Sequence, residues 1–130
     1  MDMTEPLARV RHLAAESPGL RLLLLHGSRA RGEAHAKSDW DFAFLANPDY
    51  DVDGLLASLG EAVVADDIDL ADLSRASVVL RHAVAADGVV LHEQTEGEFH
   101  AFQIAALTDW SDMEAVIRTE SQALLSRLHS

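Results

Sequence analysis

Apolar residues recur along the chain with two alternating spacings, which predict helices and strands in turn. The segment from about 5 to 17 carries them three and four residues apart, as one face of a helix requires, with Thr4 placed to cap it. Two apolar runs that are too short for helices follow, Leu20 to Leu25 and Trp40 to Leu45. Both predict buried strands, because turn-forming residues bound the runs.

The middle of the chain continues this alternation. Asp53 is placed to cap a helix that carries leucines at helical spacing, and apolar positions between about 67 and 73 alternate with acids as in a third strand. Either Ser74 or Ser77 can begin a further helix, and the run 89–91 predicts a short fourth strand. The order of elements places the chain in the α+β (α/β-like) class, with a small mixed sheet of about four strands flanked by helices.

The last segment, from about 97 to 128, predicts one long helix, because its apolar residues recur three and four apart. They are Phe99, Phe102, Ile104, Leu107, Trp110, Met113, Val116, Ile117, Leu124, Leu125 and Leu128. This stripe is either core throughout, or core at its start and an interface further along. No repeat or linker divides the sequence, so we expect a single domain over 1–130, with its core at about 20–92.

Composition narrows the class of protein. The chain has 130 residues, no cysteine and a formal net charge of -12. The lack of cysteine excludes a disulfide framework, cysteine-ligated zinc and thiol catalysis. No apolar run is long enough to span a bilayer and no secretory signal is evident, so we expect a cytoplasmic protein without membrane contact. The excess of acids disfavours direct binding to nucleic acid.

The charges are unevenly distributed along the chain. Between positions 38 and 74 there are ten acids and neither lysine nor arginine: Asp39, Asp41, Asp49, Asp51, Asp53, Glu61, Asp66, Asp67, Asp69 and Asp72. A glycine-containing loop before this stretch gathers the cations Arg21, Arg29, Arg31 and Lys37. The pattern fits either a solvated acidic face beside a basic loop, or a metal site next to a phosphate site.

Two short motifs carry candidate chemistry. A strand that ends at Gly27-Ser28 and turns into a short helix presents backbone N–H groups and a hydroxyl, an arrangement that binds phosphate. Asp39 and Asp41 lie two residues apart, so a strand places both carboxylates on one face, about 6.6 Å apart at the backbone. Such hard oxygen ligands favour Mg²⁺ or Mn²⁺, combined with substrate phosphates. Taken singly, each motif also fits an ordinary loop or an exposed strand.

Together, Gly27-Ser28, ten intervening residues and Asp39-Trp40-Asp41 resemble the signature of the DNA polymerase β-like nucleotidyltransferases. The strings at 27–32 and 69–77 resemble the minimal nucleotidyltransferase (MNT) subgroup, and the likeness covers roughly residues 20–92. Members of that subgroup are commonly antitoxins paired with a HEPN-domain ribonuclease toxin. The resemblance therefore implies a polymerase β-like fold, a hetero-oligomer with such a toxin, and transfer of AMP from ATP to a tyrosine of the toxin, which silences it.

The resemblance also assigns roles to individual residues. Asp39 and Asp41 would hold two Mg²⁺ ions, with Mn²⁺ as the alternative, and Gly27 and Ser28 would bind the triphosphate. Asp69 would be the third carboxylate ligand and would help to take the proton of the acceptor hydroxyl.

Several neighbouring residues keep more than one interpretation. Asp67 is the rival of Asp69, because period two places both on one face of the strand. Trp40 stands where an aliphatic residue is expected, and it should face away from the two acids and pack under a helix. His26 either orients the loop or is structural. The cations that either screen phosphate or are solvated are Arg29, Arg31 and Lys37.

Three classes of function follow from these observations. The first is an active nucleotidyltransferase that modifies a protein partner. The second is the same chemistry on a small molecule such as an aminoglycoside, which normally requires a further domain to hold the acceptor. The third is a non-catalytic antitoxin that binds and occludes its partner. The intact motif and the small size of the chain favour the first.

Overall fold

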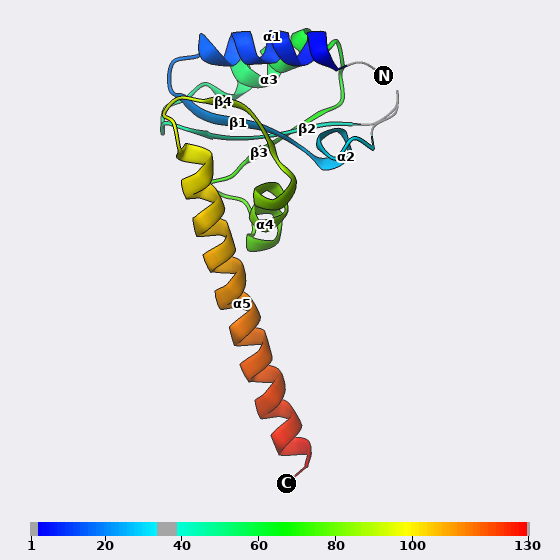
Figure 1. Ribbon diagram of the computed structural model, residues 1–130, viewed down its shortest axis with the longest axis vertical. Helices are drawn as coiled ribbons and strands as arrows, with labels where there is room; N and C mark the ends of the chain where they lie inside the picture. Colours follow the sequence, from blue (N-terminus) through cyan, green and yellow to red (C-terminus); the bar gives the residue numbers. More distant parts are fainter. Residues whose placement is uncertain (1–2, 34–38, 130) are drawn as a thin grey trace.

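The computed structural model describes residues 3–33 and 39–129. Within these residues, four strands form one mixed sheet in the order β3-β2-β1-β4 (Figure 1). β1 pairs antiparallel with both β2 and β4, whereas β2 pairs parallel with β3. The elements in chain order are α1 Thr4–Ala15, β1 Leu20–His26, α2 Gly27–Ala30, β2 Trp40–Ala46, α3 Val52–Val63, β3 Ile68–Asp72, α4 Val78–Asp87, β4 Val89–Glu93 and α5 Glu98–Leu128. The expected fold class is confirmed.

Each face of the sheet is covered by a different pair of helices. Leu23 and Phe42 are buried in a cluster with side chains of α1 and α3. Leu24 and Ala43, on the opposite face, are buried with side chains of α4 and the start of α5. Figure 1 shows α1 and α3 on one side of the sheet and α4 and α5 on the other. Because both faces are covered, β1 is a continuous apolar run rather than an alternating one.

The starts of α1 and α3 correct two sequence predictions. Thr4 does not cap α1, because the helix begins with Met3 as its N-cap residue, whose carbonyl accepts the first hydrogen bond. Asp53 does not cap α3. Asp51 does so instead, since its Oδ1 accepts a hydrogen bond from the Gly54 N–H at 3.0 Å. In both cases the helix starts one or two residues earlier than the apolar spacing alone indicates.

The start of α4 decides between the two predicted serines. Ser77 is the N-cap, with its Oγ accepting a hydrogen bond from the Leu80 N–H at 3.1 Å. Ser74 instead donates its hydroxyl to Asp72 Oδ1 at 2.7 Å, in the turn that follows β3. The four predicted strands all form, each within two residues of its expected bounds.

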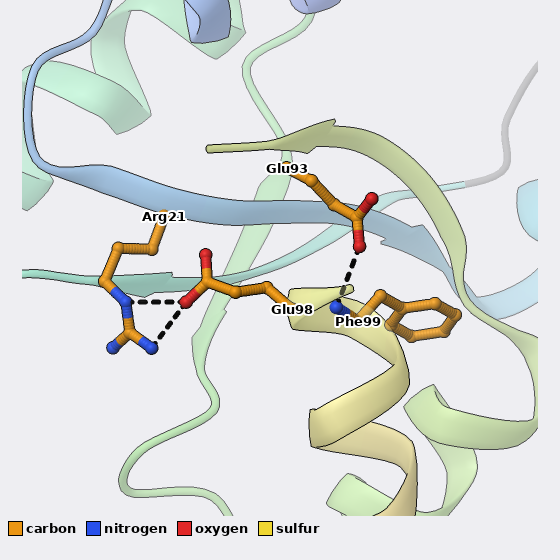
Figure 2. Close-up of polar contacts among 4 residues, drawn as sticks. All are labelled: Arg21, Glu93, Glu98 and Phe99. Carbon is orange, nitrogen blue, oxygen red and sulfur yellow. Dashed lines mark hydrogen bonds and ion pairs between the residues drawn. The ribbon is translucent and has the colours of Figure 1, made fainter. Parts of the chain in front are cut away.

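The long helix α5 is anchored at its base by two acidic side chains (Figure 2). Glu98 Oε1 accepts a hydrogen bond from Arg21 Nε of β1 at 2.8 Å. Glu93 Oε1, at the end of β4, accepts one from the Phe99 N–H at 2.9 Å and so satisfies a backbone donor of the first turn. Both contacts fix the direction in which α5 leaves the sheet.

Beyond its base, α5 packs on α4 and then continues past it. Asp109 pairs with Arg81 of α4 at 2.8 Å, and the Trp110 ring stacks on His82 with centroids 4.1 Å apart. Figure 1 shows the rest of the helix projecting away from the sheet. Phe102 is buried, as predicted for the start of the stripe, but Ile104 and Leu107 beside it are exposed. The apolar residues from Val116 onward are exposed as well, so the alternative of a stripe that is core throughout is wrong. No described helix, α5 included, is both long and apolar enough to cross a membrane.

Val64 offers a test of the backbone geometry at the end of α3. This β-branched residue caps the helix with φ 53°, in the left-handed region, and its side chain is 82% exposed. We expect Val64→Gly to raise the free energy of unfolding by about 0.5–1 kcal/mol, because relief of about 1–2 kcal/mol of strain exceeds the entropic cost of glycine. Urea unfolding measures the change, with Val64→Ala, which keeps the Cβ, as the control. A lower stability of the glycine variant would contradict the assigned conformation.

Candidate active site

Asp41 and Asp69 are register neighbours at the end of the sheet where β1 turns into α2, and Asp39 lies one residue before β2. In the sheet register His26 pairs with Asp41, and Asp41 in turn pairs with Asp69. Adjacent strands lie about 4.8 Å apart, so the two carboxylates are neighbours on one face. Asp39 stands just before β2 and, by the period of two, projects to the same side. This is the face that carries α4 and α5, beyond the area that α4 covers.

The register separates the two candidates for the third carboxylate. Asp69 lies within β3 opposite Asp41, whereas Asp67 precedes the strand. Both line an open cavity of about 360 Å³ together with Asp39 and Ile68. Asp69 is therefore the direct register partner of Asp41. Asp67 lines the same cavity but has no partner in the register of β2 with β3.

The surroundings of Asp41 disfavour the ionised form of its carboxyl group. Partial burial raises the pKa of the Asp41 carboxyl, and the negative charges of Asp69 and Asp39 raise it further. His26 and Arg29 act in the opposite direction. Three carboxylates with this mutual repulsion form a place where a cation would lower the electrostatic energy.

Gly27 is required by both its conformation and its surroundings. Its φ is 75°, and a Cβ built at this position would overlap the Asp41 Oδ2 atom. The loop backbone thus passes directly against one of the site carboxylates. Ser28 follows in the first turn of α2 and is half-buried. Gly32, with φ 75° and open space around it, lies in the turn after α2.

Arg29 differs from the sequence expectation of an exposed loop side chain. It is 3% exposed, and its guanidinium carbon lies 4.0 Å from the centroid of the Trp40 ring. Arg29 Nε also donates a hydrogen bond to the Asp39 carbonyl at 3.2 Å. These contacts tie α2 to the start of β2, and so join the Gly27-Ser28 loop to the acidic motif. Trp40, the unexpected aromatic between the two acids, was the sequence signal for this contact.

The other residues that the sequence singled out near the loop are Trp40, Arg31, His26 and Lys37. Trp40 is buried on the face away from the carboxylates, as predicted, in the cluster under α1 and α3. Arg31 is exposed and pairs with Glu33 at 3.2 Å. His26 is half-buried, and its Nε2 has no hydrogen-bond partner within the described residues. Lys37 lies outside the described residues.

The acids of the site suit a hard divalent cation by their chemistry. Carboxylate oxygens are the ligands that Mg²⁺ prefers, and Mg²⁺ is often held by one or two of them together with substrate phosphates and water. Among the residues that the structure describes, no three His, Asp or Glu side chains are grouped so that they could hold a metal ion on their own. Substrate phosphates are the oxygen ligands that ordinarily complete such a Mg²⁺ site.

The contact of Arg29 with Trp40 can be measured as a coupling free energy. A guanidinium on an indole face contributes about 2 kcal/mol when both are desolvated. In a double-mutant cycle with Arg29→Met and Trp40→Leu, we expect a coupling of at least about 1 kcal/mol in urea unfolding. Arg31→Met, at an exposed position, is the control and should change stability by less than about 0.5 kcal/mol. Additive effects of the two substitutions would show that the contact does not stabilise the fold.

Comparison with known proteins gives one family and one group of relatives. The family model "Polymerase beta, Nucleotidyltransferase" matches residues 9–97, a span that contains every acid and glycine of the site. A curated relative, the protein adenylyltransferase MntA of Aphanizomenon flos-aquae (strain 2012/KM1/D3), is 31% identical over 136 residues, covering 92% of this chain and 90% of the relative.

Solved structures of toxin–antitoxin complexes resemble the whole chain, α5 included. A toxin–antitoxin crystal structure with AMP-PNP contains a chain 29% identical to this one, with a TM-score of 0.72 over 95% of this chain and 98% of that one. The complex of the tri-AMPylated Shewanella oneidensis HEPN toxin with its MNT antitoxin contains a chain 26% identical, with a TM-score of 0.66 over 96% and 97%. With the family match over 9–97 and this likeness along its length, the chain belongs to the polymerase beta nucleotidyltransferase family.

Proposed function

We propose that this chain is a Mg²⁺-dependent nucleotidyltransferase that neutralises a HEPN toxin by transferring AMP from ATP to one of its tyrosines. The observation that carries the proposal is the placement of Asp41 beside Asp69 and against Gly27, in a chain of this family. The AMP-PNP complex supports an adenine nucleotide as donor, and the AMPylated toxin complex supports the acceptor and the partner. The choice of a tyrosine hydroxyl rests on the MNT resemblance.

In the proposed reaction the acidic residues of the site bind metal, and the glycine-serine loop binds the nucleotide. Asp39, Asp41 and Asp69 would hold two Mg²⁺ ions, or Mn²⁺, with oxygen ligands from the nucleotide phosphates. When bound, the metal would lower the pKa of the acceptor hydroxyl and neutralise the leaving pyrophosphate. Gly27 and Ser28 would hold the triphosphate beside the carboxylates, where no side chain at 27 obstructs it.

The transfer itself is a balanced displacement. The acceptor oxygen forms a bond to the α-phosphorus of ATP, while the bond from that phosphorus to the bridging oxygen breaks and pyrophosphate leaves. Asp69 takes the proton of the acceptor hydroxyl. The site is open to a protein acceptor, because its cavity is lined by exposed acids at the edge strand β3.

Two other functions compete with this one. A non-catalytic antitoxin that acts by occlusion is favoured by the projecting half of α5, which offers a binding surface independent of the carboxylates. A small-molecule nucleotidyltransferase is less well supported, because the described residues after β4 form the single helix α5 and no second layer that could enclose an acceptor.

The double variant Asp39→Ala/Asp41→Ala tests the chemistry. It should remain folded, because it removes two mutually repelling charges, and it should transfer AMP at least about 10³-fold more slowly, since metal stabilisation of the transition state is worth several kcal/mol. Intact mass of the protein encoded by the adjacent gene, the expected HEPN toxin, after incubation with ATP and Mg²⁺, measures the transfer. AMP addition by the double variant at the wild-type rate would overturn the assigned site. A tight complex without any AMP addition, by either version, would favour the occluding antitoxin.

A second pair of variants assigns the third carboxylate. Asp69→Asn should slow the transfer by about 10²–10⁴-fold if this residue takes the proton and binds metal. Asp67→Asn is the matched control, because it removes the same charge from the rim of the same cavity, and it should leave the rate close to that of the wild type. The reverse order of the two rates would move the role to Asp67.

A further inference from the structure

The apolar face of α5 continues beyond the point where the fold covers it. Phe102 and Ala106 are buried against α4 and the sheet, and the Trp110 ring stacks on His82. Ile117 and Leu124, which are 55% exposed each, lie on the same face of the helix as these residues. The face therefore runs on from the core with no side chain of the described chain to cover its second half.

The exposed part of this face is large for one helix. The half-exposed or exposed apolar side chains at its centre and flanks are Met113, Val116, Ile117, Leu124, Leu125 and Leu128. They extend over about 24 Å of helix. At on the order of 60–100 Å² each, they present on the order of 500 Å² of apolar surface. We call these six side chains the α5 arm face.

We propose that the α5 arm face is the docking surface for the protein that accepts AMP, by way of an apolar helix or helical groove of that protein. Apolar side chains at positions 113, 117, 124 and 128 are the spacing with which one helix packs into the groove of another. This inference rests on the proposed function, because it names where the acceptor of that same site is held.

Three observations select the acceptor rather than a second copy of the chain. First, α5 leaves the sheet on the face that carries Asp41 and Asp69, so a protein seated on the arm lies on the side of the carboxylates. Second, a stable interface buries about 800 Å² on each partner, more than the arm face alone supplies. An acceptor provides the remainder, since its hydroxyl must also reach the carboxylates.

The third observation is the charge. Two copies would bring together two chains of formal charge -12 each, whereas a basic partner is attracted by the same field. Within 113–128 the helix itself carries two glutamates and two arginines, so the arm face does not repel an apolar partner. The similar chains from toxin–antitoxin complexes match over 95–96% of this chain, so they include a counterpart of most of this helix.

The α5 arm face and the carboxylates are far apart, which restricts the orientation of a bound partner. The base of α5 is held by Arg21 near the start of β1, whereas the carboxylates lie at the other end of that seven-residue strand. The partner must therefore reach past α4, which stands between the two (Figure 1). One end of the acceptor protein binds the α5 arm face. The hydroxyl that accepts AMP lies at its other end and can enter the cavity beside the carboxylates.

Two charge-matched double variants test the proposal. Ile117→Asp/Leu124→Asp places two acids on the arm face, and Thr119→Asp/Ser126→Asp places two acids at the same seven-residue spacing on the opposite face of the same helix. By calorimetric titration with the protein encoded by the adjacent gene, the expected HEPN toxin, the first variant should bind at least tenfold more weakly than the wild type. The second should bind within about threefold of it, because its two acids lie away from the arm face. Both variants add the same charge near the C-terminal end of the helix, so net charge and interaction with the helix dipole are matched.

Parallel measurements separate this proposal from the proposed function. AMP transfer at saturating toxin should be restored in Ile117→Asp/Leu124→Asp, since the carboxylates are untouched. Weakened binding with no AMP transfer by any version would refute the enzyme and support the docking surface. Unchanged toxin affinity in this variant, or failure of the wild type to bind the toxin at all, would overturn the docking surface. So would a wild-type dimer in sedimentation that the variant converts to a monomer without loss of toxin affinity.

Discussion

The pairing of β2 with both of its neighbours is the constraint on which the site depends. Because His26, Asp41 and Asp69 stand at one level of three adjacent strands, their side chains must share one face. A shift of β2 by one residue would turn Asp41 into the apolar layer under α1 and α3 and bring Phe42 to the carboxylate face. The same pattern that buries Phe42 therefore holds the acids together, and the core specifies the chemistry through the register.

Two features of the site, the ionised Asp41 carboxyl and the left-handed Gly27 backbone, are locally destabilising. Burial and two like charges disfavour the ionised form of Asp41, and Gly27 adopts a left-handed conformation that leaves room for that carboxylate. Arg29 offsets part of this by tying α2 to the start of β2 and by its positive charge. A functional site commonly breaks local rules in this way and is supported by the elements around it. Here the support is the apolar layer on each face of β1.

The sequence predicted what depends on short-range periods and left open what depends on packing. The strands and the placement of Asp39 and Asp41 followed from alternation over a few residues, and the structure has them where expected. The choice between Asp67 and Asp69 needed the parallel register of β2 with β3, which joins segments far apart in the chain. Arg29 was misjudged because a loop arginine is ordinarily solvated, and only its contact with the Trp40 ring explains its burial.

α5 shows how one sequence pattern can serve two purposes. Apolar residues recur along it from Phe99 to Leu128, yet Phe102 and Ala106 are core whereas the side chains from Val116 onward are exposed, because α4 is too short to accompany the helix. No periodicity in the helix itself marks that boundary. The polar pairs of Arg21 with Glu98 and of Arg81 with Asp109 fix the covered part, so the free part is held at a set direction. In the proposed function and docking, recognition on the arm and chemistry on the sheet use separate residues, so substitutions on the arm leave the register of the carboxylates unchanged.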